Sequence, residues 1–156
     1  MPEDSTLDAY RFQMEHFPIL CVDIVFFDPT RSKTLLLRRV NKPMQGIYYT
    51  VGGHVIKNED LKAAALRVAK AETGIVLDES KLVFGGVISE KHPDSIFEGV
   101  SYNGVTVYYG YIIDERELVV FNSENDDQKW FEVTDDAIHP YIRERLQNLQ
   151  AAFTNK

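Results

Sequence analysis

Apolar residues follow one another along this chain in two distinct patterns. Short runs rich in valine, isoleucine, phenylalanine and tyrosine, bounded by turn-forming residues, predict β-strands. They cover residues 19–27, 34–39, 47–51, 82–89, 105–113 and, as a shorter piece, 129–133. The first run stops at Asp28-Pro29, and we expect Gly52-Gly53 to break the third.

Between Asn58 and Gly74 the apolar spacing changes to three or four residues, which predicts a helix. Asn58 is a candidate N-terminal cap and Gly74 a natural stop. Pro140 opens a second segment of this kind near the end of the chain. Its apolar stripe, Ile142, Leu146, Leu149 and Phe153, is typical of a helix that packs on a core.

Strands on both sides of one central helix, followed by a final helix, predict an α+β or α/β/α domain. The 156 residues, 44% of them apolar, can bury one substantial core and are too few for two independent domains. We therefore expect a single domain over residues 1–156. The longest irregular stretch, residues 93–103, is a candidate substrate loop.

Charge and hydrophobicity narrow the choice of partners. The net charge of −7 and the isoelectric point near 5.1 argue against binding to nucleic acid. No stretch approaches the ~20 apolar residues of a membrane span, and residues 1–13 are acidic, without the apolar centre of a signal peptide. We expect a cytoplasmic protein with no membrane partner. The lone cysteine, Cys21, lies in an apolar run and is expected to be a buried free thiol.

One segment combines glycines and charged residues at a specific spacing. Gly53, Glu59 and Arg67 stand at the spacing of a motif shared by Nudix hydrolases, in which a glycine is followed after five residues by glutamate. After seven more residues the motif continues as Arg-Glu-apolar-any-Glu-Glu-any-Gly-apolar. Seven residues match it in register: Gly53, Glu59, Arg67, Ala69, Glu72, Gly74 and Ile75. The chain thus resembles Nudix hydrolases, which implies their α/β/α sandwich around a central mixed sheet and a metal-bound diphosphate substrate.

Two carboxylates of that motif are missing, because Val68 and Ala71 stand where the family has glutamates. Positions 68, 71 and 72 lie on one helical face, so an ordinary member can hold several divalent cations there. Only Glu72 remains here. One carboxylate with carbonyl and loop oxygens suits a single Mg²⁺, or Mn²⁺, that shares its coordination shell with substrate phosphates. A mechanism with two metal ions therefore loses support.

The helix could instead be an ordinary alanine-rich core helix with Glu72 at its edge. The in-register Gly53, Glu59 and Arg67 count against this alternative. The family resemblance implies that Arg67 and Glu59 pair, brace the loop against the helix and orient the metal-binding carboxylate. Arg67 is therefore included among the candidate catalytic residues.

Loss of these two glutamates is a peculiarity of GDP-mannose mannosyl hydrolases, and residues 39–46 and 124–130 resemble two loops of that branch. Such enzymes release GDP from GDP-sugars by displacement at the anomeric carbon. The resemblance implies that Glu72 and the Gly52 carbonyl bind Mg²⁺ and that Arg39 stabilises the departing GDP. It places Asp23 near the sugar, and it suggests a homodimer. An aspartate inside an apolar strand must in any case be paired or functional.

Three residues differ from those that the mannosyl hydrolases have at the same positions. Glu124 and Asn125 stand where it has a glutamine metal ligand and a histidine base, and asparagine cannot accept a proton at neutral pH. Glu124 could restore a metal ligand or supply the base. His54 replaces an arginine and stays a candidate substrate contact. His92, beside the candidate substrate loop, is a candidate contact and a candidate base, although a surface histidine is the favoured interpretation.

Three functions remain open. The leading hypothesis is a Mg²⁺-dependent hydrolase of a nucleoside-diphosphate sugar, with attack at carbon. The second is a pyrophosphohydrolase that attacks phosphorus, with Glu124 activating water. The third is a catalytically quiet Nudix fold that binds a nucleotide or a protein, motivated by Val68, Ala71 and Asn125 in positions where the family has ionisable groups.

Overall fold

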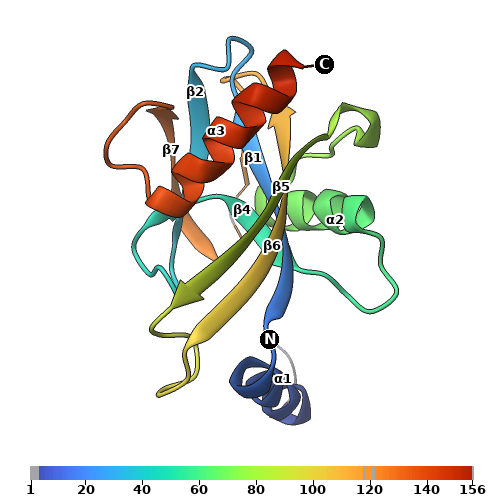
Figure 1. Cartoon of the computed structure of the whole chain (residues 1–156), viewed down its shortest axis with the longest axis vertical. Coiled ribbons are helices and arrows are strands. Elements are labelled where there is room, and N and C mark those ends of the chain that lie inside the picture. Colours follow the sequence, from blue (N-terminus) through green and yellow to red (C-terminus); the bar gives the residue numbers. More distant parts are fainter. Residues whose placement is uncertain (1–3, 118, 121, 156) are drawn as a thin grey trace.

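The computed structural model describes residues 4–117, 119–120 and 122–155; residues 1–3 of the acidic N-terminal segment lie outside this part (Figure 1). The helices are α1 (Asp4–His16), α2 (Leu61–Thr73) and α3 (Pro140–Thr154), with a 3₁₀ turn at Glu79–Lys81. The strands are β1 (Ile19–Phe27), β2 (Lys33–Arg39), β3 (Tyr48–Tyr49), β4 (Val51–His54), β5 (Val83–His92), β6 (Tyr102–Ile112) and β7 (Asn125–Glu132). No helix in the described part of the chain has the length and apolar character needed to cross a membrane.

The strands form one mixed sheet, in the order β3-β2-β1-β6-β5. In addition, β4 pairs with β1 and β7 pairs with β2. The pair β1 and β6 is parallel, from Ile19 opposite Gly104 to Phe27 opposite Ile112, whereas the other pairs are antiparallel. The predicted α+β class with a central mixed sheet is confirmed.

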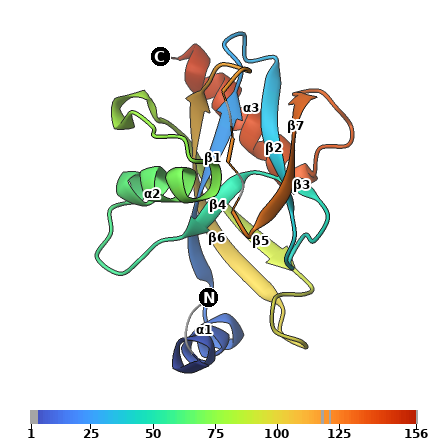
Figure 2. The same ribbon diagram turned by 180° about the vertical axis from the view of Figure 1, so that it is seen from behind.

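Helices α2 and α3 cover opposite faces of this sheet, as Figures 1 and 2 show from the two sides. Successive side chains of β1 point to opposite faces of the sheet, so this strand contributes to the cores under both helices. Val22, Ile24 and Phe26 belong to the core cluster under α2, and Val25 and Phe27 to the cluster under α3. All five are at most 1% exposed. Their burial, at about 1.5–3 kcal/mol each, fixes β1 at the centre of the domain.

Helix α1 has no counterpart among the predicted elements. Most of its residues are polar, and among its described side chains only Met14 is buried. Met14 packs with Ile19, Cys21 and Val100, and Tyr10 lies against the same cluster. Because so few of its side chains contact the core, the sequence of α1 has little of the apolar spacing that is typical of a packed helix. The helix was therefore not predicted.

The start of α2 also differs from the prediction. Asn58 is not the cap: it lies in a left-handed conformation, with φ of 70°. The capping residue is Asp60, whose side chain makes no capping hydrogen bond. Gly74 ends the helix as expected, with φ of 75° and its N–H bonded to the Lys70 carbonyl. The last strand is longer than predicted, because it begins at Asn125 instead of residue 129.

Cys21 is a buried free thiol, and its Sγ lies 3.0 Å from the Tyr102 hydroxyl. Burial raises the pKa of this thiol to about 12, so the reactive thiolate is scarce at pH 8. We expect the folded protein to react with the thiol reagent DTNB at least ~100-fold more slowly than the chain unfolded in guanidinium. Stopped-flow absorbance measures both rates. Similar rates in the two states would contradict the buried position of Cys21.

Candidate active site

Arg67 ties the loop between β4 and α2 to the helix. Its Nε donates to Glu59 Oε2 at 2.7 Å, and its Nη2 donates to Glu59 Oε1 at 2.9 Å. The same Nη2 donates to the His54 carbonyl at 2.8 Å. These contacts, together with the Ile56 N–H, hold the pKa of Glu59 at about 2. The structure thus contains the Arg67–Glu59 brace that the motif implies, and its carboxylate is charged at neutral pH.

Glu72 lies in the last turn of α2, near the Gly52 N–H. Burial raises the pKa of Glu72 to about 8; the charges of Asp23 and Glu124 also raise it, whereas Arg39 lowers it. A carboxyl group that is hard to ionise beside other carboxylates is stabilised in its charged form by a bound cation. The surroundings of Glu72 therefore fit a metal ion, with Gly52 near the same carboxylate.

No side chain fits at position 52. Gly52 lies opposite Asp23 in the β4–β1 pair, and a Cβ added to it would lie 1.9 Å from Asp23 Oδ1. Glycine at this position leaves the space that the Asp23 side chain occupies. The expectation that Gly52-Gly53 breaks the strand was wrong, because both residues lie within β4 and pair with β1.

The two residues that stand in place of the family's glutamates, Val68 and Ala71, have different surroundings. Val68 is 4% exposed and packs against Gly53, where an added Cβ would lie 3.0 Å from Val68 Cγ2. Ala71, in contrast, is exposed. Within the described ranges, no group of three or more His, Cys, Asp or Glu residues could hold a metal ion. A cation at Glu72 would need backbone, water or substrate oxygens as well, which is the usual situation for Mg²⁺.

Replacing Arg67 with lysine keeps the charge but removes the planar fork that binds Glu59. We expect the Mg²⁺ affinity to fall about 10- to 100-fold, the usual effect of losing a group that orients a metal ligand. Thermal stability should change little, because the pair is on the surface. Calorimetric titration with Mg²⁺ measures the affinity. Arg116→Lys disrupts a similar exposed fork, with Asp114, and is the matched control. An unchanged affinity in Arg67→Lys would contradict the bracing role.

The loops at residues 39–46 and 124–130 meet where β2 pairs with β7, with Arg39 opposite Asn125. Asn41 Nδ2 donates to Glu124 Oε2 at 3.1 Å. Arg39 Nε donates to the Pro43 carbonyl at 2.8 Å, which orients the guanidinium. Asn125 is buried, and its Nδ2 has no hydrogen-bond partner among the described residues. Since an unsatisfied buried donor is costly, this atom is a candidate contact for a bound ligand.

Asp23 is paired inside the protein. Its Oδ2 accepts hydrogen bonds from Thr50 Oγ1 at 2.6 Å and from Arg145 Nη2 at 3.0 Å. Arg145 comes from α3, is 0% exposed, and donates from the same nitrogen to Glu90. Burial raises the pKa of Asp23 to about 6. Arg145, which the sequence did not identify, therefore joins α3 to the strand residue that lies against Gly52.

His92 is not a surface residue, so the interpretation that its position favoured was wrong. Its side chain is buried, with Nε2 3.7 Å from Glu90 Oε2. Its ring lies 5.5 Å from the Tyr141 ring and 5.9 Å from the Tyr102 ring, measured between centroids. These contacts place His92 with the buried charges under α3. The long strand β5 carries it there, because the strand continues three residues beyond the predicted end at residue 89.

His54, the last residue of β4, contacts α1. Its Nε2 lies 2.9 Å from the Tyr10 hydroxyl, and the two ring centroids are 4.9 Å apart. Although the residue reaches solvent, desolvation of its ring by the surrounding protein lowers the pKa of His54. The ring is therefore neutral at pH 7. Sequence reasoning missed Tyr10 because it missed the helix that carries it.

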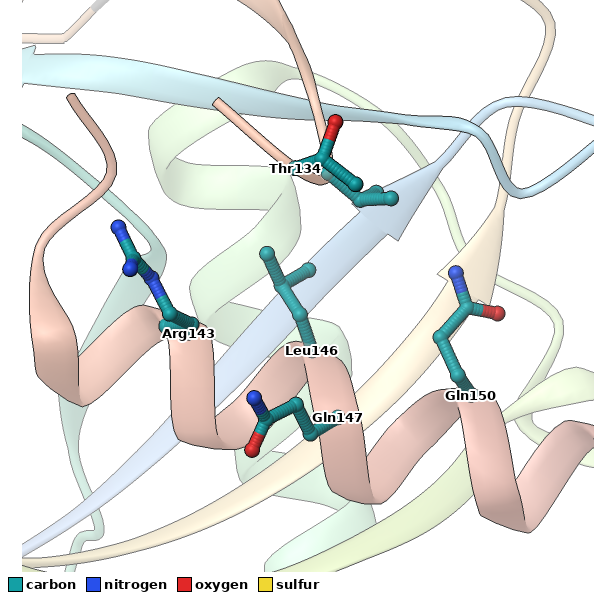
Figure 3. Close-up of a pocket in the computed structure, with 6 residues that line it drawn as sticks. Thr134, Arg143, Leu146, Gln147 and Gln150 are labelled. Atoms are coloured by element: carbon teal, nitrogen blue, oxygen red, sulfur yellow. The ribbon is translucent and has the colours of Figure 1, made fainter. Parts of the chain in front are cut away.

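A groove of about 480 Å³ lies between the 39–46 loop and the segment after β5. It is lined by Asn41, Lys42, Gln45 and residues 93–99, so the candidate substrate loop forms one of its walls. Another pocket, of about 360 Å³, lies along α3 (Figure 3). Its lining residues are Val133, Thr134, Arg143, Leu146, Gln147 and Gln150, none of which belongs to the motif or to the two loops. The first groove is thus the one that adjoins the candidate site.

Comparison of the amino-acid sequence with known families and proteins found two matches over most of the chain. The model of the NUDIX domain matches residues 18–149. The low-salt glycan biosynthesis protein Agl8 of Haloferax volcanii is 30% identical over 144 residues, which cover 91% of this chain and 88% of that protein.

Solved structures share the fold. A MutT protein from Methanosarcina mazei Go1 matches with a TM-score of 0.67 and 20% identity, covering 89% of this chain and 96% of that one. The NUDIX domain of Shewanella oneidensis NrtR, solved with ADP ribose, matches with a TM-score of 0.65 and 22% identity, covering 96% and 99%. With the domain model spanning residues 18–149 of the sequence, the chain belongs to the Nudix family.

Proposed function

We propose that this protein is a Mg²⁺-dependent hydrolase of a nucleoside-diphosphate sugar similar to GDP-mannose. Water would attack the anomeric carbon, the bond from that carbon to the diphosphate oxygen would break, and nucleoside diphosphate and free sugar would leave. The observation that carries the proposal is Glu72, the one carboxylate left among motif positions 68, 71 and 72, which lies near Gly52 and near the charges of Arg39 and Glu124. One cation and one guanidinium suit a diphosphate leaving group.

The residues take separate roles in this proposal. Glu72, the Gly52 carbonyl and Glu124 hold the cation. Arg39 binds the diphosphate, because its guanidinium matches phosphate oxygens and stabilises charge that grows as the bond breaks. When bound, Mg²⁺ supplies further neutralisation of that charge. Nudix hydrolases generally use a divalent metal ion such as Mg²⁺.

Glu124 is well placed to act as a ligand, since one of its oxygens accepts the hydrogen bond from Asn41. That bond orients the carboxylate and leaves the other oxygen for the cation. Asn125, the next residue, has no group that can accept a proton at neutral pH, but its unpartnered Nδ2 can donate to a phosphate or sugar oxygen. In the proposal, Asn125 therefore binds substrate and does not act as a base.

Two relatives support a nucleotide-sugar substrate. The name of the Haloferax volcanii protein assigns it to glycan biosynthesis, a process that consumes activated sugars. The Shewanella oneidensis domain was solved with ADP ribose, which itself contains a nucleoside diphosphate linked to a sugar. Both point to the same class of ligand for this chain.

A panel of nucleotide sugars and dinucleotides, incubated with Mg²⁺ and analysed by chromatography, tests the proposal. We expect turnover of at least one nucleotide sugar to nucleoside diphosphate plus free sugar, and loss of that turnover after removal of Mg²⁺ with EDTA. If the products are nucleoside monophosphate and sugar phosphate, the protein is a pyrophosphohydrolase that attacks phosphorus. The observation in favour of this alternative is Glu124, a carboxylate in the 124–130 loop that could activate water. Binding of a nucleotide without turnover would support a catalytically quiet domain. The observation in favour of this alternative is that Val68 and Ala71 replace two glutamates of the family.

A further inference from the structure

The backbone that leads to Gly52 is held by two buried carboxylates. The Tyr49 hydroxyl donates to Glu90 Oε1 at 2.6 Å. Thr50 Oγ1 donates to Asp23 Oδ2, also at 2.6 Å. The other oxygen of this carboxylate, Oδ1, fills the space beside Gly52 that a Cβ would take. Three of the four residues from 49 to 52 therefore contact one of the two carboxylates.

Arg145 joins the two carboxylates to each other. Its Nη2 donates to Asp23 Oδ2 at 3.0 Å and also to Glu90 Oε1. Its Nη1 donates to the Tyr141 carbonyl at 3.0 Å, one turn earlier in α3. Arg145 is 0% exposed, and both carboxylates are buried. Because a buried charge without a partner is costly, the shared guanidinium fixes the two carboxylates relative to each other.

Two aromatic rings fix the guanidinium in turn. Arg145 Cζ lies 5.3 Å from the centroid of the Tyr49 ring and 5.7 Å from that of Tyr108. Tyr49 thus contacts Arg145 through its ring and Glu90 through its hydroxyl. Helix α3 carries the arginine, and it lies on the face of the sheet opposite α2, the helix of Glu72 (Figures 1 and 2). The segment before Gly52 is therefore held from the other layer of the domain.

Gly52 is a residue whose position has to be fixed by its neighbours. It is followed by Gly53 in a strand of only four residues, and glycine restricts the backbone less than any other residue. Mg²⁺ demands a nearly ideal octahedron of oxygens at about 2.0–2.1 Å. A backbone carbonyl therefore contributes fully to Mg²⁺ binding only where the chain is held in one place.

We propose that Arg145 is a positioning residue for the cation site: through Asp23 and Glu90 it holds residues 49–52 so that the Gly52 carbonyl is in place for a cation at Glu72. This inference rests on the proposed function, in which Gly52 and Glu72 hold Mg²⁺, and it adds a role for α3 in that site. Arg145 itself touches neither the cation nor the substrate.

Thr50→Val tests the proposal with a smaller disturbance than replacement of Arg145. It keeps the shape of the side chain and removes the hydroxyl that bonds to Asp23. Fewer molecules then hold residues 49–52 in the binding position, and the apparent Kd rises as that fraction falls. We expect the Kd of Mg²⁺, from calorimetric titration with the metal alone, to rise about 3- to 10-fold, the equivalent of one hydrogen bond. Thr50→Ser keeps the hydroxyl and should remain within about twofold of the wild type.

Thr34→Val is the matched control. Thr34 is 0% exposed and donates to the Phe26 carbonyl at 2.8 Å, so the same change removes a buried hydroxyl elsewhere in the sheet. It should lower the midpoint of urea unfolding as Thr50→Val does, while the Kd of Mg²⁺ stays within about twofold of the wild type. Equal changes of the Kd in the two variants would show a general loss of stability and would overturn the positioning role.

Tyr49→Phe repeats the test at the other carboxylate, since it removes the hydroxyl that bonds to Glu90 and keeps the ring on Arg145. We expect the same rise in the Kd of Mg²⁺, about 3- to 10-fold. Tyr111→Phe, which removes a buried hydroxyl that accepts from the Asp78 N–H under α2, should leave the Kd within about twofold.

The outcomes separate the positioning role from the proposed function. An unchanged Kd of Mg²⁺ in both Thr50→Val and Tyr49→Phe, in a protein that hydrolyses a nucleotide sugar, would overturn only the positioning role. A weakened Kd in both variants, without turnover of any nucleotide sugar by the wild type, would support the positioning role and overturn the proposed function. A wild type that binds no Mg²⁺ would overturn both.

Discussion

Replacing Arg145 with alanine should lower the free energy of unfolding by about 3–5 kcal/mol, the usual cost of leaving buried charges without their partner. Arg145 is 0% exposed and donates to both Asp23 and Glu90. Without it, two buried carboxylates face each other with no cation between them. Urea unfolding followed by circular dichroism measures the difference.

Arg143→Ala is the matched control for this prediction, since it truncates the same residue type on the exposed face of α3. Arg143 bonds only to the carbonyls of Asp136 and Ile138 among the described residues, and we expect a loss of about 1 kcal/mol. Comparable losses from the two substitutions would contradict the role assigned to the buried arginine.

The effect of Arg145→Ala should also depend on pH. Burial alone would raise the pKa of Glu90, but nearby His92, the charge and hydrogen bond of Arg145 and the hydrogen bond from Tyr49 hold it at about 2. A carboxyl group with a lowered pKa stabilises the fold above its unfolded value of about 4.3, and this contribution is lost as the pH falls toward 2. The difference between the wild type and Arg145→Ala should therefore narrow between about pH 4.5 and pH 2.

Replacing Glu72 with glutamine should lower kcat/KM for the nucleotide sugar by at least ~100-fold, because the cation loses the carboxylate that holds it. Glutamine has the same shape but no charge, and burial already raises the pKa of Glu72 to about 8. The metal-free variant should therefore be at least as stable as the wild type, while losing the stabilisation that Mg²⁺ confers on the wild type. Steady-state kinetics and thermal unfolding with and without Mg²⁺ separate the two effects.

Glu144→Gln provides the control, as it makes the same change on the exposed surface of α3. It should leave both the kinetics and the response to Mg²⁺ unchanged. Retention of most activity in Glu72→Gln would contradict the assignment of the metal site.

Local spacing made most of the fold predictable. The strand at Ile19–Phe27 and the helix that opens at Pro140 agree with the structure, because runs and stripes of apolar side chains reflect burial directly. The start of α2 and the strand at Gly52 were not predicted correctly. At Gly52 the glycine reflects the close approach of Asp23, a contact between residues far apart in sequence, and not a break in the strand.

In the candidate site, too, some residues could be predicted from local spacing and others could not. Glu59, Arg67 and Glu72 lie within one short segment, so their spacing alone placed them together. Arg145 lies on the buried face of α3 among Ile142, Leu146 and Leu149, where a charged residue breaks the apolar pattern and its partners come from other strands. Tyr10 lies on a helix with little apolar periodicity. Contacts that depend on tertiary packing leave no spacing in the sequence to detect.

The position of bond cleavage tests the central proposal most directly. GDP-mannose is hydrolysed by the protein with Mg²⁺ in water enriched in ¹⁸O, and the products are analysed by mass spectrometry. The account predicts that the label enters mannose and that GDP remains unlabelled, because water attacks the anomeric carbon. Label in a phosphate group, with mannose unlabelled, would contradict it.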